Sequence, residues 1–165
     1  MRSDETGLSI AAQEPTDPDI DLADAGQRRE LRRSHYGVLL VIAIGGALGA
    51  LARFGAAQTW PTATGSFPFT TLMVNAMGCL VIGVFLVAVT EIFSAHPLLR
   101  PFFGTGVLGG FTTFSTYCVD IERLVTGGRA GIALTYLAAT AVAAVVAVTV
   151  GAWSTRRVLA KWSES

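Results

Sequence analysis

Charged residues are scarce in this 165-residue sequence, and they are unevenly distributed. Asp, Glu, Lys and Arg make up 15% of the chain, against about 25% in an ordinary soluble domain. Most of the acidic residues lie in the first 30 positions, and the stretch from 35 to 154 contains few charges. We expect residues 1–34 to form a disordered polar tail, because they contain too few apolar residues to bury a core.

The residue patterns of common catalytic sites are also missing. No Ser/His/Asp set, P-loop, paired carboxylate or metal-ligand cluster is present, and His35 and His96 both fall at the edges of apolar segments. Cys79 and Cys118 have no histidine at ligand spacing, so they predict neither a zinc site nor a disulfide framework. The basic run at 28–33 adjoins an apolar segment, where such charge usually sets membrane topology. We therefore expect no enzyme activity and no nucleic-acid partner.

Four long apolar segments are present instead. A bilayer core of ~30 Å needs about 20 residues of helix to cross it, and four segments meet that need: 36–57, 70–93, 98–124 and 130–153. A mean hydropathy of +0.54 agrees. Because the linkers between them are short, we predict one all-α transmembrane domain at 35–157 and a short tail at 158–165. This architecture predicts a multi-pass protein of the cell membrane, in contact with lipid.

The third apolar segment is rich in residues that weaken a helix. Its glycines are followed by hydroxyl residues around a phenylalanine: Gly104, Gly106, Gly109, Gly110, Thr112, Thr113, Ser115 and Thr116. Helix propensity is low across this stretch, and backbone groups freed inside hydrocarbon cost several kcal/mol each unless protein or water satisfies them. Two interpretations stay open. Either the helix is broken around an ion, or it is continuous and packs through Gly106-xxx-Gly110.

Polar side chains inside the apolar segments favour a transport function, because they are costly in a membrane and tend to mark pathways. Asn75 lies one helical turn after Thr71, and its amide offers two donors to a dehydrated anion. A hydrogen bond between helices is the simpler explanation of Asn75 taken alone. Tyr136 and Thr140 are spaced by four, which places two hydroxyls on one helix face.

Aromatic residues recur at a spacing of three around the weakened segment, at Phe111, Phe114 and Tyr117. An aromatic ring has a positive edge that can solvate an anion. Aromatic residues in membrane helices are usually packing residues, so this pattern supports a pore only together with the glycine-rich stretch. The residues alone thus predict no more than a pore for a small anion.

Three stretches of the sequence resemble the Fluc (CrcB) family of fluoride channels: GGALGALARF, FPFTTLMVNAMGCLVIGVF and GVLGGFTTFSTYCVDIERL. The likeness extends over 36–155 in order and spacing, and it leaves out the N-terminal tail. It implies four-helix subunits with a broken third helix, paired head-to-tail as an antiparallel dimer with two pores. It also implies passive export of cytoplasmic fluoride down its electrochemical gradient, which reduces fluoride toxicity.

The resemblance implies a set of polar and aromatic side chains along the fluoride pore: Asn75, Phe114, Tyr117, Tyr136, Thr140, Thr71, Ser115 and Arg53. Within this set Asn75 would contact fluoride, and Arg53 would either keep the pore mouth positive or extend toward the membrane surface. The backbone carbonyls of Gly109 and Thr112 would hold a structural Na⁺ that is not transported.

The sequence departs from the family pattern at three positions. Tyr117 replaces a phenylalanine, Asp120 replaces a glutamate, and Ala144 stands where a third hydroxyl often lies. These departures leave open how long the hydroxyl track is and how the extra Tyr117 hydroxyl acts.

Two other functions fit the sequence less well than a fluoride channel. A small proton-coupled multidrug exporter needs a carboxylate embedded in the membrane, whereas the acids here lie toward the ends of segments: Glu91, Asp120 and Glu122. A membrane assembly subunit would use Gly45-xxx-Gly49 and Gly106-xxx-Gly110 as packing faces, but it leaves Asn75 without a role.

Basic residues near the membrane are distributed asymmetrically. With four spans, the two termini and the second linker share one side, which carries eight nearby basic residues: Arg28, Arg29, Arg32, Arg33, Arg100, Arg156, Arg157 and Lys161. The opposite side carries Arg123 and Arg129. This bias predicts cytoplasmic termini. It also favours an oppositely oriented paralogue as the dimer partner, with a homodimer as the alternative.

Overall fold

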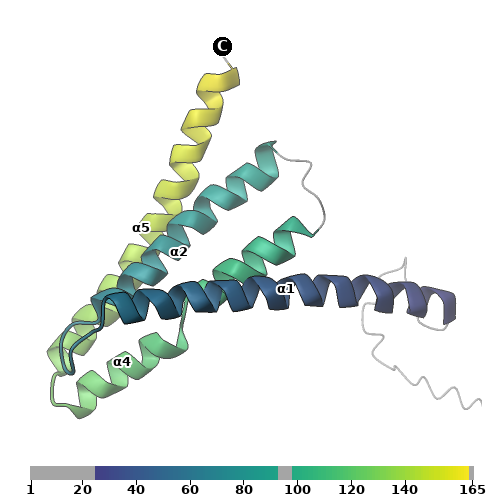
Figure 1. Cartoon of the computed structure of the whole chain (residues 1–165). Helices are drawn as coiled ribbons and strands as arrows, with labels where there is room; N and C mark the ends of the chain where they lie inside the picture. The colour runs from purple at the N-terminus through teal and green to yellow at the C-terminus, as the bar shows by residue number, and fades with distance from the viewer. Residues whose placement is uncertain (1–24, 93–97, 164–165) are drawn as a thin grey trace, which may run out of the picture. The chain divides into compact units, whose positions relative to one another are not determined.

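The computed structural model describes residues 25–92 and 98–163, and every regular element in these residues is a helix (Figure 1). The chain falls into two units, Met1–Tyr36 and Gly37–Ser165, and the functional features lie in the second. Positions 1–24 of the predicted tail lie outside the described residues. The predicted all-α class is confirmed.

The first and last helices are longer than the sequence analysis predicted. Helix α1 covers Ala25–Thr59, so it begins well before the apolar segment. Helix α5 covers Ala130–Ser163 and runs through most of the predicted C-terminal tail. The predicted starts and ends marked the change from polar to apolar sequence. Residues such as Ala, Arg, Glu, Leu and Lys have high helix propensity in water as well as in lipid, so helices continue past that change.

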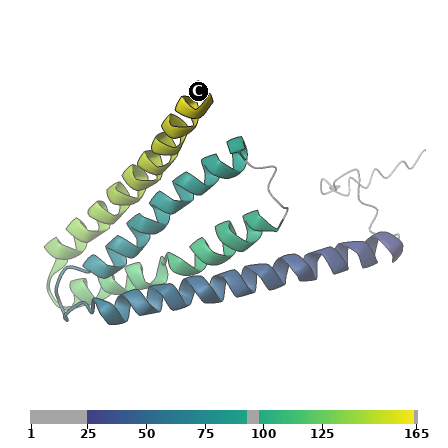
Figure 2. The ribbon, with the colours of Figure 1, turned by 45° about the horizontal axis from the view of Figure 1, so that its top comes forward.

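Helix α2 (Phe69–Val87) lies beside α5 in both views of the ribbon (Figures 1 and 2). The two backbones approach closely where each helix carries a glycine. A Cβ atom at Gly83 would overlap the Val148 carbonyl oxygen, and one at Gly151 would overlap the Leu80 carbonyl oxygen. Small residues at such crossings allow dense packing between membrane helices. Beyond its last α-helical residue, α2 continues as a π-helical turn, η1 (Ala88–Ile92).

The third apolar segment is broken, as Figure 2 shows. Its first part is the π-helical η2 (Arg100–Leu108) followed by α3 (Gly109–Phe111), and its second part is α4 (Ser115–Thr126). Between them Thr112 is extended, with φ −73° and ψ 159°. The 12 residues of α4 span only about 18 Å, which is too short to cross a bilayer core alone. The predicted break is confirmed, and it lies well inside the span.

The glycine face of the third segment packs within the same subunit. A Cβ atom at Gly49 would overlap the Val107 carbonyl oxygen, and one at Gly110 would overlap the Gly46 carbonyl oxygen. Gly45 similarly has no room beside Phe102. The segment is therefore not the continuous helix of the second interpretation, but the glycine packing face that this interpretation predicted is present. These glycines are used inside the subunit, which removes the main support for an assembly subunit built on them.

Among the described residues, three helices are long and apolar enough to cross a membrane: Tyr36–Thr59, Phe69–Thr90 and Ala130–Trp162. The broken segment adds the fourth predicted span in two pieces. Many large apolar side chains point outward, as expected for a surface that contacts lipid, among them Leu40, Leu51, Leu134, Val142 and Val145. The chain is a multi-pass membrane protein.

Candidate functional site

The break in the third segment is bridged by the side chain of Asn75 from α2. The Thr113 backbone N–H donates to Asn75 Oδ1 at 2.8 Å, and Asn75 Nδ2 donates to the Thr113 carbonyl oxygen at 2.9 Å. The Asn75 amide thus gives the Thr113 N–H an acceptor and the Thr113 carbonyl a donor, in place of the partners that a continuous helix would supply. The hydrogen bond between helices that the sequence suggested is present. Because Nδ2 carries two hydrogens, one of them remains available for a ligand.

Thr113 precedes Phe114, the N-cap residue of α4, and its hydroxyl bonds to the first turn of that helix. Its Oγ1 accepts the backbone N–H of Thr116 at 3.1 Å and donates to Thr116 Oγ1 at 3.0 Å. The first N–H groups of a helix have no partner inside the helix, and a threonine hydroxyl commonly satisfies one of them. Ser115 Oγ lies 3.3 Å from Thr113 Oγ1. The structure therefore places Ser115, one of the predicted pore residues, on this exposed cap.

These two bonds redirect N–H groups that a continuous helix would use. In an α-helix the Thr113 N–H would bond to the Gly109 carbonyl, and the Thr116 N–H would bond to the Thr112 carbonyl. Here Asn75 and the Thr113 hydroxyl take those hydrogens. In the described part of the chain, no other hydrogen bond reaches either carbonyl oxygen. Gly109 and Thr112 are the two residues whose carbonyls the family resemblance assigned to Na⁺.

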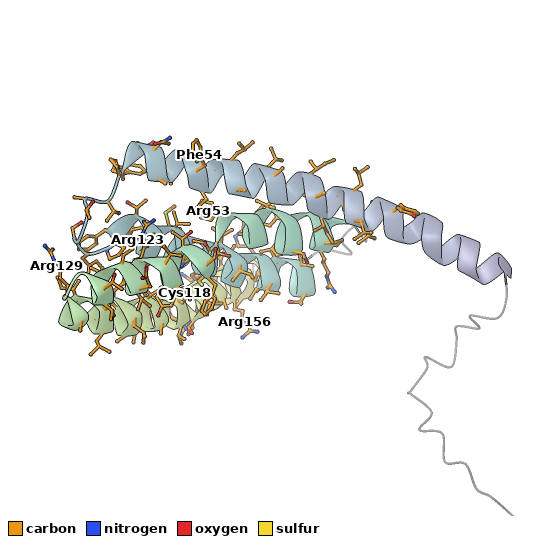
Figure 3. The ribbon with its side chains drawn as sticks, turned by 90° about the horizontal axis from the view of Figure 1, so that it is seen from below. Arg53, Phe54, Cys118, Arg123, Arg129 and Arg156 are labelled. Atoms are coloured by element: carbon orange, nitrogen blue, oxygen red, sulfur yellow. The ribbon has the colours of Figure 1, made fainter. Side chains whose placement is uncertain are left out.

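Arg53 contacts the other side of the break. Its Nε donates to the Gly110 carbonyl oxygen at 3.2 Å, and Figure 3 shows Arg53 on the side of α1 that faces the broken segment. The guanidinium thus satisfies a carbonyl at the C-terminal end of α3, where a positive charge is favourable. Arg53 lines a cavity of about 400 Å³ together with Thr71 and Thr113. This cavity is separate from the groove that contains Asn75.

That groove has a volume of about 480 Å³ and lies over the break. Four of the predicted pore residues and both predicted carbonyl residues line it: Asn75, Phe114, Tyr117, Thr140, Gly109 and Thr112. The Phe114 and Tyr117 rings lie 5.9 Å apart, centroid to centroid. In the single subunit Phe114 is 77% exposed, so the groove is open on one side.

Thr140 carries an orphan hydroxyl in this groove. The residue is only 8% exposed, and its Oγ1 is buried with no hydrogen-bond partner in the described part of the chain. Hydroxyls in membrane helices usually bond back to their own helix, and Thr135 and Thr149 do so with the carbonyls of Gly131 and Val145. An unpaired buried hydroxyl costs about 1–3 kcal/mol, and a bound ion or water is one of the partners that can satisfy such a group.

The remaining predicted hydroxyls converge on Asp120, a residue that the sequence analysis did not place in the pore. Thr71 Oγ1 donates to Asp120 Oδ2 at 2.8 Å, and the Tyr136 hydroxyl lies 3.5 Å from the same oxygen. Tyr136 is fully buried, and its ring lies 5.2 Å from that of Tyr117, centroid to centroid. The Tyr117 hydroxyl donates to the Leu137 carbonyl oxygen at 3.2 Å. The extra hydroxyl of Tyr117 is therefore used to fix its own ring.

Asp120 also lines a polar cavity of about 630 Å³ at the end of the bundle where α4 meets α5. The walls are the 62–68 loop, the end of α4 and two arginines, Arg123 and Arg129, which Figure 3 labels at this end. Arg129 Nη1 donates to the Gly65 carbonyl oxygen. Asp120 thus lines the same cavity as two solvent-exposed arginines and also bonds to the hydroxyls of Thr71 and Tyr136.

The fold and the site define a small multi-pass membrane protein with a broken helix beside a groove of partly unsatisfied donors. Residues 40–152 match the family described as CrcB-like protein, Camphor Resistance (CrcB), and the chain belongs to this family. It is 58% identical over 133 residues to the fluoride-specific ion channel FluC 1 of Streptomyces coelicolor, covering 81% of this chain and 86% of that protein. It is 54% identical over 124 residues to FluC 2 of Streptomyces avermitilis, covering 75% and 78%. A relative from Thermobifida fusca, also named FluC 2, is 43% identical over 122 residues, covering 74% and 90%.

Proposed function

We propose that this chain is a subunit of a fluoride-specific ion channel that exports cytoplasmic fluoride passively. Its relatives carry that name, and the groove at the break supplies suitable chemistry. The observation that carries the proposal is the orphan Thr140 hydroxyl, which lines the same groove as the half-used amide of Asn75. A small dehydrated anion would accept a hydrogen from each of these groups.

In this proposal each groove residue has a defined task. Asn75 donates its remaining Nδ2 hydrogen to fluoride while its other hydrogen holds the Thr113 carbonyl. Thr140 donates its hydroxyl hydrogen. Phe114 and Tyr117 turn their positive ring edges toward the anion. These groups together replace part of the water that fluoride loses.

Tyr136 would act as a switchable donor at the next step of the pathway. Its hydroxyl lies 3.5 Å from Asp120 Oδ2, at the limit of hydrogen-bond distance, so the interaction is weak. A passing fluoride can therefore compete with the carboxylate for the hydroxyl hydrogen. Thr71 stays closer to Asp120, at 2.8 Å, and holds the carboxylate in place. The arginines of the polar cavity, Arg123 and Arg129, raise the local anion concentration at the pathway's end.

Export needs no nucleotide site in this scheme. Fluoride enters an acidified cell as neutral HF and dissociates in the cytoplasm, where the anion is trapped. A membrane potential that is negative inside then drives the anion out, at ~2.3 kcal/mol per charge for each 100 mV. The channel only has to provide a selective path.

We further propose that the Gly109 and Thr112 carbonyls bind a structural Na⁺. Unwound carbonyls in broken membrane helices coordinate such cations, and these two oxygens have lost their helical donors. In the described residues, no group of three or more His, Cys, Asp or Glu side chains could hold a metal instead. The cation would neutralise carbonyl dipoles at the break rather than pass through the pore.

The open side of the groove suggests that a partner subunit covers it. Phe114 is largely exposed in the single subunit, so fluoride in the groove would be open to lipid on that side. We propose that a second, antiparallel subunit closes it. The asymmetry of basic residues supports an oppositely oriented paralogue. Two relatives, FluC 2 and FluC 3, both come from Streptomyces avermitilis, so numbered copies do occur together in one organism. A homodimer is the alternative.

A matched pair of threonine variants tests the pore assignment. Thr140→Val removes the orphan hydroxyl and keeps the side-chain shape, whereas Thr149→Val removes a hydroxyl that only bonds back to its own helix. In fluoride efflux from proteoliposomes, Thr140→Val should slow efflux at least about tenfold, and Thr149→Val should match the wild type. Equal rates in the two variants would remove Thr140 from the pathway.

A further inference from the structure

The carbonyls of Gly109 and Thr112 are left without helical donors by two different side chains. Asn75 Oδ1 takes the Thr113 N–H, and Thr113 Oγ1 takes the Thr116 N–H. Without these two acceptors, both N–H groups would find the nearest helical carbonyls, because an unpaired N–H in a membrane costs several kcal/mol. The break would then shorten, and the Gly109 and Thr112 carbonyls would turn into the helix.

We propose that Asn75 is a positioning residue for the structural cation as well as a pore residue. By holding the Thr113 N–H at 2.8 Å, it keeps the Gly109 carbonyl turned toward the cation. Thr113 does the same for the Thr112 carbonyl. This inference rests on the Na⁺ site proposed above. The Asn75 amide would then contribute both to fluoride binding in the groove and to cation binding at the break.

The chemistry of residue 75 predicts a distinctive order of effects. A leucine can neither accept the Thr113 N–H nor donate to fluoride, so Asn75→Leu should lose both functions. An aspartate loses the bond to the Thr113 carbonyl oxygen, but it still accepts the Thr113 N–H that frees the Gly109 carbonyl, and a charged acceptor makes that bond stronger. As a carboxylate it cannot donate to fluoride, and its charge repels the anion. Asn75→Asp should therefore keep the cation site while it abolishes conduction.

Cation binding can be measured without conduction. A ligand that binds only the folded state raises its thermal midpoint, and the stabilisation grows with the logarithm of the ligand concentration relative to Kd. Purified full-length protein in detergent would be titrated with Na⁺ at constant ionic strength, with N-methyl-glucamine as the balancing cation, and Tm followed. Asn75→Leu should need at least about tenfold more Na⁺ than the wild type for the same rise in Tm, which corresponds to ~1.4 kcal/mol. Asn75→Asp should stay within about threefold of the wild type.

A second pair of variants tests the same idea at the other carbonyl. Thr113→Val removes the hydroxyl that holds the Thr116 N–H, and Thr113→Ser keeps it. The valine variant should need about tenfold more Na⁺, and the serine variant should match the wild type. If Asn75→Leu does not fold, the Thr113 pair still tests whether Na⁺ binding needs a side chain that frees a carbonyl at the break. Thr140→Val serves as a control, because it lies in the groove but holds no backbone group, and its Na⁺ dependence should be unchanged.

The outcomes separate the two proposals. If Na⁺ does not raise the Tm of the wild type, the cation site is wrong and the inference falls with it. If Na⁺ raises the wild-type Tm but Asn75→Leu and Thr113→Val respond at wild-type concentrations, only the positioning role is wrong. Fluoride efflux by the wild type is measured separately, so neither outcome is confused with failure of the channel function.

Discussion

Arg53 Nε donates to the Gly110 carbonyl oxygen at 3.2 Å, across the interface between α1 and the broken segment. The same backbone stretch approaches α1 so closely that a Cβ atom at Gly110 would overlap the Gly46 carbonyl. The close glycine contact brings α3 within reach of Arg53, and Arg53 then satisfies a carbonyl that the break has freed. The arginine at the end of the first span thus supports the broken helix directly.

This contact predicts that geometry matters at residue 53 as well as charge. Lysine keeps the positive charge but lacks the guanidinium Nε, which carries the bond. Arg53→Lys should lower the free energy of unfolding by about 1 kcal/mol, the usual net value of one hydrogen bond. Chemical denaturation of the purified protein measures this, with the exposed Arg123→Lys as the control. Unchanged stability in Arg53→Lys would show that charge alone accounts for the residue.

Asn75→Asp should abolish fluoride efflux while the dimer stays intact. The carboxylate repels the anion and offers it no hydrogen, but it still accepts the Thr113 N–H that bridges the break. Efflux would be followed with a fluoride electrode, and the oligomeric state by size-exclusion chromatography in detergent. Wild-type efflux from this variant would mean that Asn75 does not contact the permeating ion.

Thr112→Ser should have a mild effect on both stability and Na⁺ dependence. The Thr112 hydroxyl bonds back to the Leu108 carbonyl oxygen at 3.0 Å, and serine keeps that bond. The proposed cation ligand is the main-chain oxygen, which the substitution leaves in place. The lost methyl contacts Gly78, so a small loss of packing remains. Tm followed across a Na⁺ titration would test this. A Na⁺ requirement raised more than about tenfold would point to the side-chain hydroxyl as the ligand.

Gly109→Val is the companion change, and it should disturb the cation site at the break more than Thr112→Ser does, because it adds a branched side chain to a residue whose carbonyl is a proposed ligand. A Cβ atom at Gly109 would meet nothing within 4 Å inside the subunit, so the isolated subunit has room for it. A loss of Na⁺-dependent stabilisation in Gly109→Val would therefore come from the cation site or the partner subunit. Full retention of that stabilisation, together with severe loss in Thr112→Ser, would exclude the proposed carbonyl site.

The distribution of basic residues predicts one dominant membrane orientation. Ser163 would be changed to cysteine in a chain whose native Cys79 and Cys118 are replaced, and labelled in intact cells with a reagent that does not cross membranes. We expect little labelling from outside, because the positive-inside bias keeps the C-terminus in the cytoplasm. Substantial external labelling would indicate dual topology. In that case a homodimer suffices and a paralogous partner is not needed.

The sequence predicted the parts of the fold that depend on local residue type. Apolar length located the spans, and the low helix propensity around Gly109 and Thr112, together with the family resemblance, located the break. The predicted start of α1 and the predicted end of α5 were wrong, because a helix need not end where its sequence stops being apolar. A helix ends where its backbone hydrogen bonds end, and polar residues with high helix propensity can continue it.

The parts of the site that were missed depend on long-range contacts. Asp120 meets Thr71 and Tyr136 from two other helices, and no spacing within one segment reveals such a meeting. The contact from Arg53 to Gly110 likewise joins residues 57 positions apart. The unpaired hydroxyl of Thr140 also depends on residues that are distant in the sequence. Its place on the hydroxyl face was predicted, but the lack of any partner for its Oγ1 became visible only when its neighbours were placed.

Fluoride efflux from liposomes that contain only the purified wild-type protein tests the central claim most directly. Liposomes would be loaded with potassium fluoride, efflux started by a potassium ionophore, and external fluoride followed with an electrode; matched liposomes would be loaded with potassium chloride. We predict rapid fluoride efflux that stops when the gradient is spent, and chloride efflux no faster than from protein-free liposomes. Fluoride efflux at the protein-free rate, or equal efflux of both anions, would contradict a fluoride-specific channel.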